Sequence, residues 1–211
     1  MRIAVIGATG QTGRRVSEQG LARGHHMTAL ARRPEAVTLR DKNLVIAQAD
    51  VLEADQLTAA LTGAEAIVST LGAGASRAPT VIYSQGITNA LSAMDQNGIS
   101  HLAVISAAPV GPRDEQPFLE RRVAMPLLER VFGATYDDMR RMEALLRTSD
   151  VNWVSLRPPR LVNRPATGSY RLDATRPLPK ARRITHSDLA SALLDSLDRQ
   201  DLYHRAVFVA N

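Results

Sequence analysis

Cysteine is absent from the 211-residue chain. This absence excludes disulfides, thiolate nucleophiles, zinc–sulfur sites and iron–sulfur clusters. The histidines do not stand with carboxylates at metal-ligand spacing, so we expect no metal site. They are His25, His26, His101, His186 and His204.

Long apolar runs are also absent. Near the amino terminus the apolar stretch is only Ile3 to Ile6, whereas a membrane span needs roughly 20 such residues. No basic segment leads into a longer apolar one, so a signal peptide is not indicated. With 45% hydrophobic and 22% charged residues, the composition is that of one globular domain over residues 1–211. We expect a cytoplasmic protein without a membrane partner.

Lysine is nearly absent. Only Lys42 and Lys180 occur among the 26 basic residues, and the other 24 are arginines. A codon bias explains such a preference, but arginine also suits bidentate binding of phosphate. The arginines are scattered along the chain rather than gathered in one helix or arm, so we expect no nucleic-acid partner.

Short apolar segments alternate with helical patterns. Strands are predicted at 2–6, 26–31, 44–49, 66–70, 101–106 and 152–156. Helices are predicted at 12–23, 55–61, 81–97, 136–148 and 187–197, the last capped by Ser187. Continuous apolar strands alternating with helices indicate a parallel sheet covered on both faces. The fold class is therefore α/β, a Rossmann-type doubly wound sheet in a single domain with a small C-terminal lobe.

The second half of the chain is less regular. Residues 108–135 carry four prolines and are expected to form a lid, and 157–168 (RPPRLVNRPATG) are expected to be irregular. Strand-like pieces surround Tyr170 and Ile184, and residues 207–209 are expected to close the sheet. We therefore expect a cofactor half over 1–107, and the lid, the sixth strand and substrate-side elements over 108–211.

A glycine-rich turn, GATGQTG, stands between the first strand and the first helix. Gly7 allows a tight turn, Gly10 allows close approach of a pyrophosphate, and Gly13 allows the helix to pack near the strand. The start of the helix offers free N–H groups to phosphates. We expect polar contacts to the same ligand from Thr9, Gln11 and Thr12.

The residues after the second strand indicate which dinucleotide binds. NAD sites often place a carboxylate there, on the ribose 2′-hydroxyl, but this chain has Arg32 and Arg33. An arginine binds a 2′-phosphate bidentately, so NADP(H) is favoured over NAD(H), with Arg32 preferred because it comes first. Two surface arginines on a turn are the alternative. Further cofactor contacts are expected at the ends of the third and fourth strands, from Asp50, Val51, Leu71 and Gly72.

Six segments occur in an order that resembles a known family. They are GATGQTG, ADVLEADQL, LGAGASRAPTVIYSQGITNALSAM, YDDMRRMEALLRTSDVNWVSLRPPRL, TGSY and ITHSDLA. The chain resembles the atypical short-chain dehydrogenases/reductases of the NAD(P)H-binding, NmrA-like group, and within it the flavin reductase / biliverdin-IXβ reductase type. The resemblance implies an NADPH-binding Rossmann fold and reduction of a planar, electron-poor acceptor such as flavin. Some members of the group are cofactor-sensing regulators.

The tyrosine–lysine pair of ordinary short-chain dehydrogenases is missing. Four residues after the tyrosines stand Ile87, Arg140, Ala174 and Val207, and none is a lysine. A mechanism in which lysine lowers the tyrosine pKa is therefore disfavoured. Hydride transfer to a flavin needs mainly proximity and orientation, so a reductase remains favoured, with flavin as substrate rather than prosthetic group.

The resemblance suggests candidates for the reacting end of the site. It implies a hydroxyl near the nicotinamide at Ser106, and Pro158 is expected in the wall under that ring. Tyr136 would donate a proton or stack on substrate, and Arg160 would anchor an acidic group. The alternatives are a backbone-bonded Ser106, a packing role for Tyr136 and a loop carbonyl bound to Arg160. Two departures from the flavin-reductase type, Ala107 for serine and Met139 for histidine, disfavour a tetrapyrrole substrate.

The sequence is compatible with three functions. The leading one is an NADPH-dependent reductase of a flavin, a quinone or an aromatic metabolite. A regulator that binds NADP(H) and a protein partner without catalysis is the second, and an epimerase, dehydratase or cyclase of the same superfamily is the third. No long exposed apolar helix distinguishes a monomer from a dimer.

Overall fold

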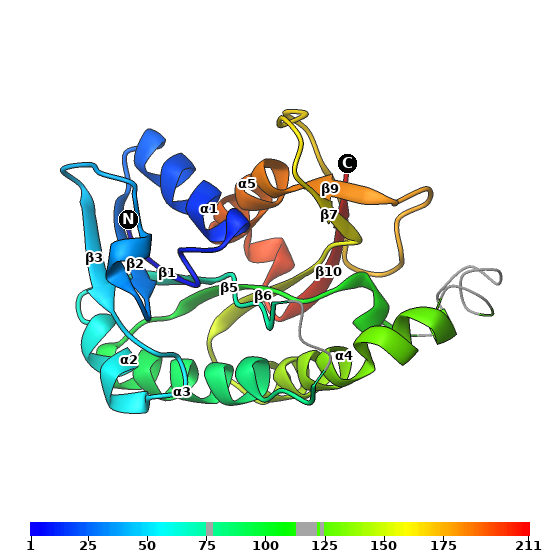
Figure 1. The fold of residues 1–211 in the computed structure, drawn as a ribbon, viewed down its shortest axis with the longest axis horizontal. Helices are drawn as coiled ribbons and strands as arrows, with labels where there is room; N and C mark the ends of the chain where they lie inside the picture. The colour runs from blue at the N-terminus through cyan, green and yellow to red at the C-terminus, as the bar shows by residue number, and fades with distance from the viewer. Residues whose placement is uncertain (75–77, 113–121, 123–124) are drawn as a thin grey trace.

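The computed structural model describes residues 1–74, 78–112, 122 and 125–211. Its main sheet has eight strands in the order β3-β2-β1-β4-β5-β6-β10-β8 (Figure 1). These strands are β1 (Arg2–Ile6), β2 (His26–Ala31), β3 (Leu44–Gln48), β4 (Ala66–Ser69), β5 (His101–Ile105), β6 (Asn152–Arg157), β8 (Arg171–Asp173) and β10 (Arg205–Ala210).

All the neighbouring pairs of this sheet are parallel except β10 and β8. Val5 of β1 lies beside Ala29 of β2 on one side and Val68 of β4 on the other. The strand order therefore reverses at β1, and ligands of such sheets bind beyond the carboxyl ends of the strands at this point. The predicted doubly wound parallel sheet is confirmed, with one antiparallel strand added at its edge.

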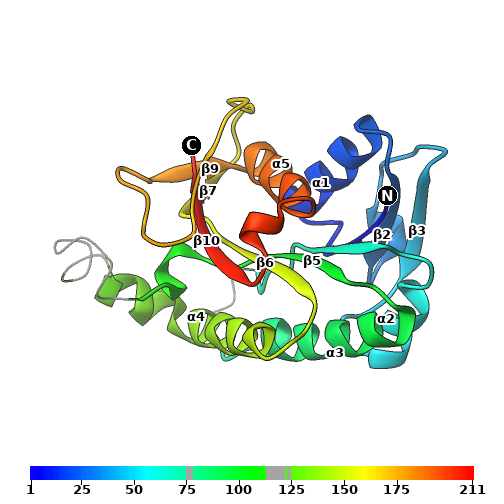
Figure 2. The same ribbon diagram turned by 180° about the vertical axis from the view of Figure 1, so that it is seen from behind.

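Helices cover both faces of the sheet (Figures 1 and 2). One face carries α1 (Gln11–Ala22) and α5 (His186–Ser196), and the other carries α2 (Ala54–Ala60), α3 (Ile82–Asn97) and α4 (Met125–Arg147). Because successive side chains of a strand point to opposite faces, each strand supplies both layers.

Two apolar cores result from this layering. In β1, Ile3 and Val5 belong to the core under α1 and α5, whereas Ala4 and Ile6 belong to the core over α2, α3 and α4. Both sets are buried. This explains why the strands have continuous apolar runs rather than an alternation.

Helix α4 begins at Met125, so the prediction of a helix starting at residue 136 was wrong for its first eleven residues. Pro126 does not prevent this start, because a proline in the first turn of a helix lacks only an N–H that has no helical partner there. The predicted lid, 108–135, therefore ends in regular helix. Its residues 113–121 and 123–124 lie outside the described residues.

The stretch predicted as irregular contains a short strand, β7 (Arg160–Val162), so that prediction was wrong at these three residues. It pairs with β9 (Arg183–Thr185) in a separate two-stranded parallel sheet. The partner lies more than twenty residues further along the chain, so no local pattern reports the pairing. The strand-like pieces expected near Tyr170 and Ile184 are confirmed as β8 and β9.

The cap of α5 also differs from the prediction. The helix begins at His186, and the hydroxyl of Thr185, not that of Ser187, accepts a hydrogen bond of 3.0 Å from the N–H of Asp188. Threonine and serine are both good caps, and the chain enters the helix two residues earlier than the pattern indicated. No helix within the described ranges has the length and apolar character of a membrane span.

Candidate functional site

Three glycines hold the turn after β1 against the backbone of neighbouring segments. Gly7 has a φ of +80°, and a Cβ there would lie 2.9 Å from the carbonyl oxygen of Thr70. A Cβ at Gly13 would lie 2.3 Å from the carbonyl oxygen of Gly7. Gly10 donates its N–H to the same carbonyl at 3.0 Å. The close packing of helix, turn and strand therefore requires glycine at positions 7 and 13.

The amino terminus of α1 has no side-chain cap. Gly10 is the N-cap residue, the first turn contains no carboxylate, and no side chain of the described residues caps the first-turn N–H groups. Such a terminus offers unpaired N–H groups and the positive end of the helix dipole to an anion. By contrast, α5 is capped by Thr185 and has Asp188 in its first turn.

A cavity of about 100 Å³ lies beside this turn, at the carboxyl ends of β1, β2, β3 and β4. Six of the predicted cofactor residues line it: Gly7, Thr9, Arg32, Asp50, Val51 and Leu71. Asp50 accepts a hydrogen bond from the N–H of Leu52 at 3.1 Å, and the carbonyl of Val51 accepts one from Asn89 at 2.9 Å. The turn after β3 is thus fixed by its own hydrogen bonds, and Arg32 faces the cavity from the end of β2.

The other predicted cofactor residues do not line this cavity. Gln11 and Arg33 are exposed, and Gly72 follows Leu71 in the segment after β4. Thr12 is buried, and its hydroxyl lies 2.8 Å from Nδ1 of His186 at the start of α5. Its side chain therefore joins two helices, and a polar contact from Thr12 to the cofactor stays a prediction.

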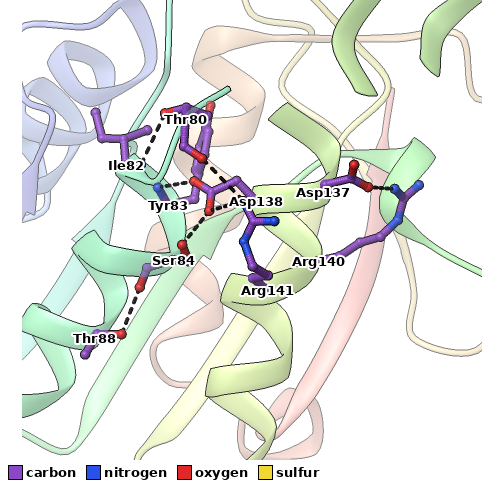
Figure 3. Close-up of polar contacts among 9 residues, drawn as sticks. All are labelled: Thr80, Ile82, Tyr83, Ser84, Thr88, Asp137, Asp138, Arg140 and Arg141. Atoms are coloured by element: carbon purple, nitrogen blue, oxygen red, sulfur yellow. Dashed lines mark hydrogen bonds and ion pairs between the residues drawn. The ribbon is translucent and has the colours of Figure 1, made fainter. Parts of the chain in front are cut away.

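A buried carboxylate that sequence reasoning missed fixes the segment after β4. Asp138 of α4 is fully buried and accepts hydrogen bonds from the N–H of Tyr83 at 2.9 Å and from the hydroxyl of Ser84 (Figure 3). Arg141 also donates to it, at 3.1 Å. The Tyr83 hydroxyl in turn accepts from the N–H of Ala73 at 3.0 Å.

Asp138 therefore acts on the site through Tyr83. Burial raises the pKa of Tyr83, and the nearby Asp138 raises it further, so the hydroxyl stays protonated. A signal for the burial of Asp138 exists in the sequence. It stands four and eight residues before Met142 and Leu146, on the apolar face of α4.

The ends of β5 and β6 form the far side of the site. Ser106 is buried, and its N–H donates to the carbonyl of Leu156 at 2.8 Å. Its Oγ has no hydrogen-bond partner among the described residues. The carbonyl of Pro158 accepts from the N–H of Ala108 at 2.8 Å. An unpaired buried hydroxyl is costly, so Ser106 is suited to bonding a ligand at this edge.

A buried ion pair holds the end of β6 to α4. The guanidinium of Arg157 donates to both carboxylate oxygens of Glu143, at 3.0 and 2.6 Å, and Ser155 donates to the same carboxylate at 3.2 Å. The Arg157 guanidinium also lies 5.4 Å from the ring centroid of Phe208. The ion pair thereby fixes the position of the adjacent Pro158, the residue expected under the nicotinamide ring, relative to α4.

The remaining predicted catalytic residues lie in two different places. Tyr136 is half-buried on α4 beside Phe132, with 6.1 Å between ring centroids, and burial raises its pKa. Met139, one helical turn on, is buried. Arg160 is exposed on β7 and lines a separate cavity with other arginines. The structure therefore does not bring Arg160 into the cavity beside the glycine turn.

The strand order, the uncapped α1 and the cavity along the strand ends define a Rossmann-type dinucleotide-binding protein. The residues fit such a cofactor, since a Cβ at Gly7 or Gly13 would obstruct the turn and the buried hydroxyl of Ser106 has no partner in the described ranges. A family model described as NAD(P)H-binding matches residues 7–200. The chain belongs to this NAD(P)H-binding family.

Curated relatives include proteins of different names. The (4-alkanoyl-5-oxo-2,5-dihydrofuran-3-yl)methyl phosphate reductase of Streptomyces griseus is 30% identical over 74% of this chain and 46% of its own length. The chain thus matches less than half of that reductase. The uncharacterized sugar epimerase YhfK of Bacillus subtilis is 26% identical over 98% of this chain and 92% of its own length.

A solved structure supports the fold. A short-chain dehydrogenase/reductase from Veillonella parvula, in complex with NADP, has a TM-score of 0.78 to this chain at 18% sequence identity. The match covers 100% of this chain and 94% of the other. The family and the fold together indicate an oxidoreductase- or epimerase-like NAD(P)-binding protein.

Proposed function

We propose that the protein is an NADPH-dependent reductase that transfers hydride to a flat conjugated acceptor: a flavin, a quinone or an aromatic metabolite. The observation that carries the proposal is the cavity in which Arg32 and the glycine turn meet at the strand ends. A cytoplasmic location and a small planar molecule as the partner, without nucleic acid or membrane, belong to the same proposal.

Arg32 supports the preference for NADPH. Its exposed guanidinium lines the cavity at the end of β2, where a ribose is bound in such folds. A planar fork of N–H donors matches a phosphate bidentately. Arg32 would hold the 2′-phosphate, while the N–H groups at the start of α1 would hold the pyrophosphate.

The acceptor end is supported by Ser106 and Tyr136. When bound, the cofactor supplies the hydride. The buried Ser106 hydroxyl offers one hydrogen bond to a bound ring system, and Tyr136 keeps its proton because burial raises its pKa. The chain's two lysines, Lys42 and Lys180, do not stand four residues after a tyrosine, as the catalytic pair of ordinary short-chain dehydrogenases requires. Orientation of two rings, rather than alcohol oxidation, is the chemistry that these residues favour.

Two relatives bear on the choice of reaction. The Streptomyces griseus protein is named a reductase, which supports reduction here. YhfK is named a sugar epimerase, which favours the epimerase alternative. Epimerisation needs an acid and a base on opposite sides of one carbon. The missing tyrosine–lysine pair favours the reductase over the epimerase. It equally favours the second alternative, a cofactor-sensing regulator that binds a protein partner.

The test is oxidation of NADPH in the presence of FMN, FAD, riboflavin and a series of quinones. We expect acceptor-dependent oxidation with at least one of them, and faster oxidation of NADPH than of NADH. Tight NADPH binding without oxidation across the panel would support the regulator instead. The substitution Ser106→Ala keeps the backbone hydrogen bond to Leu156. It should lower the rate of NADPH oxidation with the same acceptor while NADPH binding changes little.

A further inference from the structure

A second cavity, of about 440 Å³, lies beside the small sheet formed by β7 and β9. Its volume is in the range of small-molecule sites. Among the residues that the structure describes, no carboxylate lines it. The lining residues are Arg160, Leu161, Val162, Asn163, Arg164, Arg182 and Arg183. We refer to it below as the arginine pocket.

The four arginines of this pocket are close to one another without a compensating charge. Arg160 and Arg183 are direct partners in the register of the parallel pair, so their side chains leave the same face of the small sheet. Like charges at paired positions destabilise a sheet. None of the four forms an ion pair or hydrogen bond through its guanidinium with another described residue. A bound anion would relieve this repulsion.

Neighbouring arginines of the same lobe behave differently. Arg171 donates to the carbonyls of Pro179 and Asn211, at 3.0 and 2.9 Å, and Arg176 pairs with Asp173 at 3.5 Å. These two therefore have structural partners, whereas the guanidinium groups of the pocket have none within the described part of the chain. The contrast indicates that the positive charge of the pocket is kept available rather than spread evenly over an arginine-rich surface.

The positive surface continues past the pocket. An adjoining cavity of about 390 Å³ is lined by Lys180, Arg182, Arg183 and Asn211. Arg182 and Arg183 are shared by both cavities. A ligand carrying two negative charges would therefore meet several cationic groups from β9 and the turn before it.

The position of the pocket connects it to the acceptor end of the site. Arg160 follows Pro158 by two residues, which is about 7 Å of extended chain at most. Pro158 is bonded to Ala108, at the ends of β6 and β5 where the acceptor ring is proposed to lie. Figure 1 shows β7 and β9 above β6 and β10, on the α5 side of the sheet.

The same arginines are too far away to bind the ribose phosphate of the cofactor. Arg32 stands at the end of β2, and β2 and β6 are four strand spacings apart in the sheet. At about 4.8 Å per spacing this is roughly 19 Å. An anion held in the arginine pocket would therefore be a different group from the ribose phosphate at Arg32.

We propose that the arginine pocket binds the phosphate, or an equivalent dianionic group, of the acceptor that the reductase reduces. The substrate class is thus a flat conjugated ring that carries a phosphate monoester. This inference deepens the proposed function and rests on it for the identity of the ring. Anion binding by the pocket does not depend on that identity.

The first experiment measures anion binding without catalysis. Pyrophosphate is titrated calorimetrically into NADPH-saturated protein at low ionic strength, so that the glycine turn is already occupied. We expect one site, and a loss of affinity of at least tenfold in the double variant Arg160→Gln/Arg183→Gln. Arg199→Gln is the matched control, because Arg199 pairs with Asp201 away from the pocket at 2.6 Å. It should keep the wild-type affinity.

Two results would overturn the proposal that the arginine pocket binds an anion. One is equal pyrophosphate affinity in the wild type and the double variant. The other is a short DNA duplex that binds more tightly than pyrophosphate and loses its affinity in the same variant, because that result indicates a nucleic-acid surface. The four guanidinium groups are exposed, so we expect the double variant to unfold at the wild-type urea midpoint.

The second experiment separates the pocket from the reaction. FMN and riboflavin share one ring system and differ by a phosphate, so their kcat/KM values are compared. We expect at least a tenfold preference for FMN, which the double variant abolishes by lowering kcat/KM for FMN alone. If neither flavin nor a quinone is reduced while pyrophosphate binds at the pocket, the proposed reductase fails and the anion site stands. An equal kcat/KM for the two flavins would overturn the phosphate-bearing substrate.

Discussion

The region around β1 and the region around β6 in the main sheet are held together by different means. Around β1 the chain approaches itself through backbone alone, and Gly7 and Gly13 leave no room for a side chain. In α4 and α5, the helices on either side of the β6 end of the sheet, the structure depends on buried carboxylates instead: Asp138, Glu143 and Asp188 are each at most 2% exposed. The first region makes room for a cavity through residues without side chains, and the second is held in place by hydrogen bonds and ion pairs to buried carboxylates.

Asp188 illustrates the second type of construction. Burial would raise the pKa of this carboxyl group, but hydrogen bonds from Thr167, Thr185 and Asn211 lower it. One side chain thereby joins the start of α5, the turn before β8 and the end of β10. The comparison predicts that the two regions respond differently to substitution.

The largest effect is expected from Glu143→Gln. The Arg157 guanidinium, 6% exposed, would lose its charged partner. Removing one member of a buried ion pair typically costs about 3–5 kcal/mol. Urea unfolding should show a loss of this size.

Glu65→Gln is the control, because the pair of Glu65 with Arg2 is largely exposed. Exposed pairs contribute little, so this variant should unfold close to the wild type. Similar losses in the two variants would show that the buried pair does not support the β6 region.

A smaller effect is expected from Gly13→Ala. The added methyl group would meet the Gly7 carbonyl oxygen at 2.3 Å and the Thr70 hydroxyl at 2.6 Å. Overpacking of this kind costs about 1–3 kcal/mol. The unfolding free energy should fall accordingly, and NADPH binding measured by calorimetry should weaken as the turn shifts.

Gly133→Ala is the matched control for that change. Gly133 also lies within a helix, and a Cβ there would meet no described residue from outside its own helix within 4 Å. Alanine is the better helix former by about 0.5–1 kcal/mol, so this variant should be slightly stabilised. Loss of stability at both glycines would contradict a specific contact at Gly13.

Arg32→Glu tests the charge at the cofactor end. We expect NADPH binding to weaken by roughly 1–3 kcal/mol relative to NADH, since a charge-assisted hydrogen bond is lost. Dissociation constants of both cofactors provide the measurement. Arg33→Glu introduces the same charge one residue away, outside the cavity lining, and should discriminate less. If Arg32→Glu weakened the binding of NADPH and NADH equally, Arg32 would not be the residue that binds the 2′-phosphate.

The smallest effect is expected at His186, where the two regions meet. Burial, together with the nearby charge of Arg15, lowers the pKa of this histidine, so the fold favours its neutral form beside Thr12. The unfolded chain binds the proton more readily, and stability should decrease as the pH falls below about 6.5. His186→Gln should flatten that decrease in urea unfolding followed against pH.

Above about pH 8 the histidine is neutral in both the folded and the unfolded chain. The wild type and His186→Gln should therefore show the same pH dependence there. An unchanged slope in the acid range would mean that His186 does not contribute to the acid sensitivity of the fold.

The sequence predicted the first region well and the second poorly, for a physical reason. Glycine spacing and apolar strands are local signals, so the turn at 7–13 and the placement of Arg32 followed from neighbouring residues. The pairing of β7 with β9 depends on residues more than twenty positions apart. Asp138 and Glu143 stand among arginines in α4, which is typical of surface charges, although the spacing of Asp138 to Met142 and Leu146 places it on the apolar face of the helix. Their burial depends on Tyr83 and Arg157, which come from other elements.

The near absence of lysine has a practical consequence at the arginine pocket. Lys180, the residue that borders Arg182 in the adjoining cavity, and Lys42, in the loop before β3, are the chain's two side-chain amines. Amine-reactive dyes would therefore label side chains at two places only, just before β3 and just before β9, two strands that lie toward opposite margins of the molecule (Figure 1). Energy transfer between the two labels would report changes in their separation in solution, and protection of Lys180 from labelling would report occupancy of the neighbouring pocket, without any engineered attachment site.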